Sequence, residues 1–384
     1  MRAQKIALTV AAAVTGLFLM TVGAVVVWPY LSASLEEGPQ VANNFEQQLF
    51  APMVDMQMPQ EKRIAKSELP ALRGATVPVK EFTLSAPQTH GNLTIFLIHG
   101  RDTVKDARIL TLQEALEQNV ATVHETGGGV LLIDNRGNLP LLIQAGDIVK
   151  GGTQDRTLPF DMLIPAKTER MSIPALCVEQ GRSFPRAGDL STSFETATQQ
   201  LPGRTLKLAA SRKSQIEVWN NVRTLQANLA RNAGGSVQAP LSQTSLQLSL
   251  EHHRVQDAVQ DYLARLSPAA DGKKDVIGYV VAVNGLIQSA DVYASADLFQ
   301  RLWPKLIRAS AVSALAEKRP GNYQAPTVES VKRFLSDADR GDAFRVNTSS
   351  ASHVIRQETD RQVRFDTCDS ARQNVVLHRS FLVK

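Results

Sequence analysis

Cysteine is scarce in this chain. Only Cys177 and Cys368 occur among 384 residues, and two thiols cannot form a disulfide framework or a four-thiolate zinc site. Disulfide-rich secreted scaffolds are therefore excluded. Cys177 stands between Leu176 and Val178, which is more typical of a small buried apolar residue than of a nucleophile, although export would permit a disulfide with Cys368.

The short signatures of several enzyme classes are also missing. No serine stands in a Gly-x-Ser-x-Gly elbow, and the pair His124-Glu125 lacks the second histidine of an HExxH zinc site. The glycines near Gly151 have neither P-loop nor dinucleotide-binding spacing, and no zinc-finger or RNA-recognition signature occurs. We therefore assign no catalytic residue and expect no metal, no cofactor and no nucleic-acid partner.

The excess of positive charge is small and unevenly distributed. The chain has 42 basic and 37 acidic residues, a net charge of +5. Residues 301–384 hold 15 of the basic and 9 of the acidic residues, so the positive excess lies at the end of the chain. Such a segment either meets phosphates or anionic lipid, or forms a solvated face whose charges are paired locally.

A long apolar run occurs at the front of the chain. Residues 6–27 contain no charge, and these 22 residues would make a helix of about 33 Å, enough to cross a hydrocarbon core of about 30 Å. Arg2 and Lys5 precede the run, and Trp28 and Tyr30 follow it where interfacial aromatic residues belong. This pattern predicts a single-pass anchor in the cell membrane, with the body on the extracytoplasmic (periplasmic) side.

A cleaved signal peptide is the alternative interpretation of the same run. A cut after Ala24 would release the body as a secreted protein. In either case composition divides the chain into four parts: the anchor or signal peptide at 1–31, a Pro- and Gln-rich linker at 32–79, an α+β domain at 80–316, and a basic, β-rich extension packed on that domain at 317–384.

Strand patterns dominate the body. The run 93–99 (LTIFLIH) predicts a buried strand, and residues 276–293 contain two apolar runs around Asn284 and Gly285, the strongest short hairpin signal. Apolar residues at helical spacing in 255–266 predict a packed helix. Because strands and helices do not alternate strictly, we expect an α+β fold: a mixed or antiparallel, β-rich body with several packed helices, preceded by the N-terminal transmembrane helix.

Two local signals concern the ends and interiors of helices. Thr111 and Glu114 have the spacing of a capping box, which predicts that a short helix begins there. Another helix is expected to begin near Ser295. Pro304 should kink or divide it, because proline cannot donate to the carbonyl four residues back.

A polar, glycine-rich stretch, residues 146–156, follows one predicted strand. Glycines beside amide and guanidinium donors suit the close approach of a phosphate or carboxylate. The apolar run 173–178 then ends in further charged and amide residues. We expect both stretches to contribute to one ligand site, whose candidate residues are Asp147, Lys150, Gln154, Asp155, Arg156, Glu179 and Arg182. A glycine turn held by an Asp–Arg pair is the alternative.

The motifs GDIVKGGTQDRTL and IPALCVEQGRSF, with the later segment VIGYVVAVNGLIQSADVYASADLFQRLWPKLI, resemble a known domain family. It is the domain named for its association with ADP-ribosylglycohydrolase (ARG) and rhodanese-phosphatase proteins. The resemblance covers roughly residues 90–315. It implies no established activity, but it implies that five candidate residues belong together: Asp147, Gln154, Arg156, Glu179 and Arg182.

These observations lead to one expected function and one alternative. We expect an exported, membrane-anchored module that binds or scaffolds an anionic small molecule or an envelope protein. The alternative is a hydrolase or transferase acting on an ADP-ribose-like or sugar-phosphate substrate, for which Asp147 and Glu179 would have to converge so that acid and base roles can separate. The sequence leaves the oligomeric state open.

Overall fold

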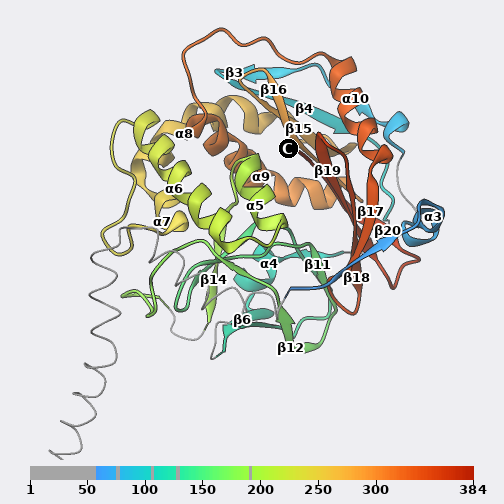
Figure 1. The fold of residues 1–384 in the computed structure, drawn as a ribbon, viewed down its shortest axis with the longest axis horizontal. Helices are drawn as coiled ribbons and strands as arrows, with labels where there is room; N and C mark the ends of the chain where they lie inside the picture. The colour runs from blue at the N-terminus through green and yellow to red at the C-terminus, as the bar shows by residue number, and fades with distance from the viewer. Residues whose placement is uncertain (1–57, 75–77, 105–107, 127–129, 190–192) are drawn as a thin grey trace, which may run out of the picture. The chain divides into compact units, whose positions relative to one another are not determined.

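A ten-stranded sheet lies at the centre of the part of the chain that the structure describes (Figure 1). That part comprises residues 58–74, 78–104, 108–126, 130–189 and 193–384 of a computed structural model, and it belongs to one compact unit, Met56–Lys384. The predicted membrane anchor lies outside the described residues. Within them, no helix has the length and the apolar character needed to cross a membrane.

The main sheet is antiparallel throughout its paired strands. Its order is β1-β17-β18-β19-β20-β16-β15-β4-β2, with β3 also paired to β4. The strands are β1 Glu61–Ile64, β2 Thr83–Leu84, β3 Gln88–His90, β4 Leu93–His99, β15 Val276–Val283, β16 Leu286–Tyr293, β17 Asp342–Asn347, β18 Ser352–Glu358, β19 Gln362–Asp369 and β20 Val375–Val383.

The hairpin predicted from Asn284 and Gly285 is confirmed. Strands β15 and β16 pair directly on either side of it, and the turn residues have positive φ values of 53° and 77°. Asn and Gly tolerate this conformation better than other residues, which is why the pair directs a tight hairpin. Strand β4, predicted as buried, pairs with β15 and is buried along all but its last residue.

The chain between β4 and β15 forms three smaller sheets. Their orders are β13-β10-β9-β14, β11-β8-β5 and β12-β7-β6. The strands are β5 Leu110–Thr111, β6 Ala121–Glu125, β7 Leu131–Asn135, β8 Leu141–Ile143, β9 Asp147–Gly151, β10 Arg156–Thr157, β11 Met162–Ile164, β12 Thr168–Ile173, β13 Leu176–Cys177 and β14 Phe194–Gln200. Only the pair β5–β8 is parallel among these described strands.

The α-helices of the described residues pack around these sheets. They are α3 Leu69–Leu72, α4 Leu112–Glu117, α5 Arg204–Ser211, α6 Gln215–Asn232, α7 Leu246–Glu251, α8 His253–Leu266, α9 Ala296–Ala316 and α10 Val328–Asp337. Short 3-10 turns occur at η1 Lys66–Glu68, η2 Val79–Glu81, η3 Ser267–Ala270 and η4 Ala338–Arg340. The capping box is confirmed: Thr111 caps α4 through the amide of Glu114, and the Glu114 carboxylate accepts from the Thr111 amide.

Helices α9 and α10 cover opposite faces of the main sheet. The ring of Tyr279 in β15 makes a tilted contact with Phe299 and an edge-to-face contact with Trp303 of α9. Its neighbour Val280 belongs to the core cluster that contains Val331 of α10. Successive side chains of a strand point to opposite faces. The sheet is therefore buried on both sides in this region, which explains the continuous apolar run of β15.

Pro304 does not divide its helix. Of the two outcomes that the sequence predicts, a kink or a division, the division is wrong, since α9 continues as one helix from Ala296 to Ala316. An interior proline costs roughly 3 kcal/mol in a helix. Most residues of α9 are buried against the sheet on one side and helices α6 and α8 on the other, and this packing offsets the cost.

The main sheet also joins segments that the sequence pattern separates. Strand β1, within the stretch interpreted as linker, pairs with β17. Strand β20, from the stretch interpreted as a C-terminal extension, pairs with β16. The predicted fold class, a mixed, antiparallel, β-rich body with several packed helices, is confirmed.

Candidate functional site

Four of the seven residues proposed from the sequence lie in one group of buried charges, and a fifth, Gln154, accepts a hydrogen bond from Arg156 of that group. Asp155 is fully buried, and its carboxylate accepts two hydrogen bonds from Arg186, at 2.8 and 2.6 Å. The amide of Gly151 and the hydroxyl of Ser245 also donate to Asp155. Its own amide donates to Glu179 at 3.0 Å, which links the loop after β9 to the residues after β13.

Glu179 is held by Arg182. The guanidinium donates to both carboxylate oxygens at 2.8 Å, and it also donates to the backbone carbonyls of Gly152 and Phe184 at 2.7 Å. Burial favours the protonated form of Glu179, but hydrogen bonds led by that from Arg182 outweigh this effect and lower its pKa. Both side chains of the Glu179–Arg182 pair are therefore charged. The guanidinium of Arg182 is occupied by Glu179 and by backbone carbonyls.

Arg156, the first residue of β10, also belongs to this group of charges. Its guanidinium donates to Glu125 at 2.7 Å and to Gln154 at 2.8 Å, and it contacts the thiol of Cys177. Burial raises the pKa of Cys177 more than Arg156 lowers it, so the thiol is not activated as a nucleophile. Cys177 and Cys368 are both free thiols.

We call this group the arginine–carboxylate cluster: Glu125, Asp155, Arg156, Glu179, Arg182, Arg186 and Asp189. Every charged group in it has an oppositely charged partner within it. Three guanidinium groups face four carboxylates, so the cluster holds no surplus positive charge for an anion. Its geometry is that of a clamp joining the loop after β9, the residues after β13 and, through Ser245, the start of α7.

Asp147 and Lys150 do not join the arginine–carboxylate cluster. Asp147 forms a buried ion pair with Lys305 of α9, at 2.7 Å, and Lys150 pairs with Glu251 at 2.8 Å. Asp147 begins β9 and Gly151 ends it, so about 13 Å of extended chain separates Asp147 from the cluster. The convergence of Asp147 and Glu179 that an acid–base pair would require is therefore absent.

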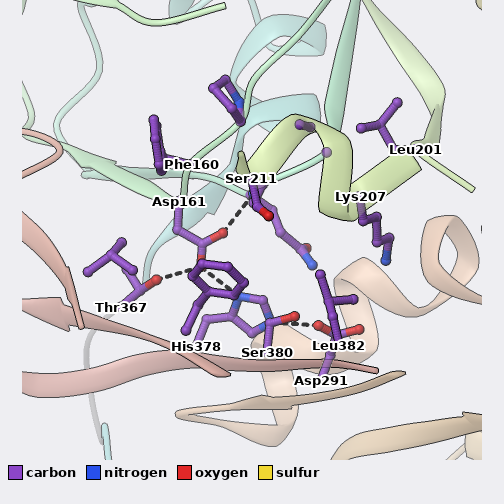
Figure 2. Close-up of a pocket in the computed structure, with 17 residues that line it drawn as sticks. Phe160, Asp161, Leu201, Lys207, Ser211, Asp291, Thr367, His378, Ser380 and Leu382 are labelled. Carbon is purple, nitrogen blue, oxygen red and sulfur yellow. Dashed lines mark hydrogen bonds and ion pairs between the residues drawn. The ribbon is translucent and has the colours of Figure 1, made fainter. Parts of the chain in front are cut away.

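A different site, which the sequence analysis did not identify, lies in a hollow beside α5. The hollow is small and partly open to solvent (Figure 2). Apolar side chains such as Phe160, Leu201 and Leu382 form much of its wall. Charged and polar side chains enter from separate elements: Gln144, Asp161, Lys207, Asp291, His378 and Ser380. We call this the His378 hollow.

His378 lies between two carboxylates in this hollow. Its Nδ1 is 2.6 Å from Asp161 and its Nε2 is 3.1 Å from Asp291, while its ring stacks on Tyr293 at 4.4 Å between ring centres. Burial opposes a charged imidazole, but the two carboxylates, Asp161 most strongly, outweigh it and raise the pKa of His378 to about 9. At neutral pH the ring is an imidazolium that donates from both nitrogens.

Asp161 and Asp291 differ in the number of hydrogen bonds that their carboxylate oxygens accept. Asp161 also accepts from the amide of Ala145 and from Thr367, both at 2.6 Å. The Oδ2 atom of Asp291 receives no hydrogen bond of standard geometry from a described residue, although Ser380 lies beside it across the strand pair. The Oε1 atom of Gln144 is likewise buried and unpaired within the described residues. Gln144 Oε1 is therefore an open acceptor in the wall, and Asp291 Oδ2 is engaged only by the Ser380 hydroxyl.

Lys207 brings a positive charge to the same hollow from α5 (Figure 2). It is half-buried, and its ammonium group forms no ion pair or hydrogen bond of standard geometry with a described residue, although its charge acts on Asp291. Burial alone would raise the pKa of Asp291, but the charge of Lys207 and the hydrogen bond from His378 lower it. The charges of Asp161, Asp291, His378 and Lys207 sum to zero at neutral pH.

One sequence signal could have pointed to this hollow. Asp291 and His378 each interrupt an apolar strand, in SADVY and VVLHRS. A charged side chain in a buried strand needs a partner or a ligand. Among the described residues, no group of three or more His, Cys, Asp or Glu side chains is placed to hold a metal ion.

The chain matches one protein-family model. Residues 81–382 match the model of the ARG and Rhodanese-Phosphatase-superfamily-associated Protein domain. No curated protein and no solved structure matches the chain. The matched residues include both the arginine–carboxylate cluster and the His378 hollow.

Proposed function

The chain belongs to the ARG and Rhodanese-Phosphatase-superfamily-associated Protein domain family, a family of unknown function, and we propose that it is a binding module whose ligand occupies the His378 hollow. One observation carries this proposal: among the described residues, Gln144 Oε1 in the wall of the hollow has no donor, and Asp291 Oδ2 has only the Ser380 hydroxyl beside it. Leaving a buried polar group unpaired costs roughly 1–3 kcal/mol. A ligand that donates to these oxygens would recover that free energy.

The charges and walls of the hollow limit the chemistry of the ligand. Because the four charged side chains balance, a ligand without net charge is favoured over an ion. Open acceptors require O–H or N–H donors, and apolar walls such as Phe160 and Leu201 favour a ligand with some apolar surface. Lys207 supplies one donor for an oxygen of the ligand. We therefore propose a small neutral molecule that carries hydroxyl or amino groups.

The same geometry favours binding over acid–base catalysis. A general base must be unprotonated near the working pH, whereas His378 is protonated there. A general acid must direct an N–H group at the substrate, whereas both ring nitrogens of His378 face Asp161 and Asp291. The alternative of a hydrolase based on Asp147 and Glu179 is not supported by their separate ion pairs with Lys305 and Arg182.

Ligand screening by thermal shift tests this function. Full-length protein should be stabilised by a hydroxyl- or amine-bearing compound, because a ligand that binds only the folded state raises its melting temperature. The stabilisation should disappear in Asp291→Asn and weaken in Lys207→Met. Lys318→Met, which removes an exposed lysine, is the matched control and should retain it. A stabilising compound that acts equally on Asp291→Asn would contradict the proposed site.

We further propose that residues 1–31 hold this module on the extracytoplasmic (periplasmic) side of the cell membrane. The uncharged run 6–27, its preceding basic residues and its following aromatic residues support a single-span anchor. A secreted form after signal cleavage is the alternative. An alkaline phosphatase fusion after Lys384 should be active and should sediment with membranes; activity in the soluble periplasmic fraction would favour cleavage, and an inactive fusion would contradict export.

A further inference from the structure

A second group of charged residues lies on the other face of the main sheet. Side chains alternate along β20, so His378 and Ser380 line the His378 hollow while Arg379 lines an open groove beside α10. Six basic side chains line this groove: Arg73, Lys80, Lys332, Arg333, Arg340 and Arg379. Two acidic residues, Asp337 and Asp339, do so as well. We call it the basic groove.

Two buried guanidinium groups and one half-buried one form the base of the basic groove. Arg73, Arg364 and Arg379 converge on the carboxylate of Asp366, with Nε–O distances of 2.7, 3.4 and 2.8 Å. Asp366 is fully buried and Arg364 is 1% exposed. The second carboxylate near them, Asp339, contacts Arg364 and is largely exposed. Among the described residues, these three guanidinium groups therefore share one buried carboxylate, Asp366, and one exposed carboxylate, Asp339.

This excess of positive charge is held close to the groove surface. Burial lowers the pKa of Arg73, and the neighbouring charges of Arg364 and Arg379 lower it further against the attraction of Asp366. Another anion near Arg73 would relieve this repulsion. The fold thus holds like charges together where a negatively charged group could approach from solvent.

The basic side chains in the outer wall of the basic groove have few acidic partners. Lys80, Lys332 and Arg333 form no ion pair with a described residue, and Arg340 lies 3.9 Å from Asp337, its nearest carboxylate. Lys332 and Arg333 are adjacent in α10 and both are exposed. Long basic side chains around a concave surface raise the local concentration of anions.

We propose that the basic groove binds a phosphate group, through the guanidinium of Arg73 at its base and the side chains of Lys332 and Arg333 at its wall. Guanidinium groups suit phosphate because their paired N–H donors match two phosphate oxygens, and lysine adds a mobile point charge. This site is separate from the His378 hollow and does not depend on the neutral ligand proposed there. The phosphate belongs either to a soluble phosphate ester or to the headgroup of an anionic lipid.

Titration of glycerol phosphate into full-length protein in a zwitterionic detergent tests this site. Binding should be saturable and weakened by salt. It should fall about tenfold or more in Lys332→Gln/Arg333→Gln, because two charge-assisted contacts are lost. The matched control is Lys318→Gln/Arg319→Gln, which neutralises an exposed Lys-Arg pair outside the groove and should bind normally. Asp291→Asn should also bind normally, which separates this site from the proposed function.

A second arm distinguishes the source of the phosphate. Phosphatidylglycerol added to the micelles should displace glycerol phosphate if the groove takes lipid headgroups, whereas phosphatidylcholine should not. Displacement identifies a lipid headgroup as the occupant, and its absence identifies a soluble phosphate ester. Failure of glycerol phosphate to bind, or an equal loss in the Lys318/Arg319 control, would overturn the proposal. These variants alter exposed side chains, so the test does not require substitution of the half-buried Arg73.

Discussion

His378 and Asp291 lie on adjacent strands of the main sheet, and their side chains form a buried contact of 3.1 Å between Nε2 and Oδ1. Asp161 closes the other side of the imidazole at 2.6 Å. Three charged groups thus meet in the wall of a largely apolar hollow, where water cannot screen them. This relationship makes the stability of the protein sensitive to the proton on His378.

We predict that the folded protein loses stability in mildly alkaline solution. The pKa of His378 is raised from an ordinary value of 6.5 to about 9 in the folded state. The stabilisation is complete below pH 6.5 and is lost as pH rises through about 9. It is on the order of 3 kcal/mol for a shift of this size. Denaturant unfolding at pH 6, 8 and 10 measures it.

A variant series assigns this pH dependence to His378. His378→Gln should remove the fall in unfolding free energy between pH 6.5 and 9, while His253→Gln, which alters an exposed histidine, should leave it unchanged. An identical fall in wild type and His378→Gln would show that another group is responsible.

The arginine–carboxylate cluster is predicted to stabilise the fold. Arg182→Met leaves Glu179 buried without its main partner and should lower the free energy of unfolding by roughly 3–5 kcal/mol. Arg212→Met breaks a pair with Glu217 whose side chains are 53% and 43% exposed, and should change it by less than about 1 kcal/mol. Urea unfolding compares them; equal effects would refute a clamp.

The buried pair of Asp147 and Lys305 allows a double-variant test. Lys305→Met should destabilise the protein by roughly 3–5 kcal/mol, because the Asp147 carboxylate remains buried without a counter-charge. Adding Asp147→Asn removes that charge while keeping an oxygen for the amide of Gln144. The double variant should therefore regain much of the lost stability. Additive losses in the unfolding measurements would argue that the two residues are not coupled.

Gly278 is predicted to tolerate no side chain. A Cβ atom at this position would lie 2.2 Å from the backbone oxygen of Asp291 on the paired strand β16. Gly278→Ala must therefore push the two strands apart, at a cost of roughly 1–3 kcal/mol or more. Thermal unfolding measures the loss, and Gly272→Ala, where a Cβ meets no atom within 4 Å but φ is positive, controls for backbone strain alone. A smaller loss at Gly278 than at Gly272 would contradict the clash.

Local signals predicted several elements correctly because their causes are local. The hairpin around Asn284 and Gly285 follows from the φ values that its turn requires, and the capping box at Thr111 satisfies amides within one helical turn. Pro304 shows the opposite case: its local penalty is overridden by the packing of α9. That packing depends on residues distant in sequence.

The sequence indicated part of the arginine–carboxylate cluster for the same reason. Asp155 and Arg156 share one turn, and Glu179 follows the strand paired to β10, so short-range geometry brings them together. Asp147 and Lys150 belong to the same stretch of sequence, but an extended strand carries Asp147 away from the cluster and turns Lys150 toward Glu251. The sequence indicates which stretches contribute to the arginine–carboxylate cluster. Strand geometry decides which residues of those stretches belong to it.

The sequence alone determined the family, the β-rich fold class and the positions of tight turns and caps, because these depend on residue order and local conformation. Tertiary structure alone decided the partners of His378. Asp161, Asp291 and Lys207 come from distant stretches of the chain, and they meet because β20 lies between β19 and β16 with α5 packed against it. Side chains alternate along β20, so His378 points into the His378 hollow and Arg379 into the basic groove. Pairing of β20 with β16 and β19 sets the register that decides which residue faces which side.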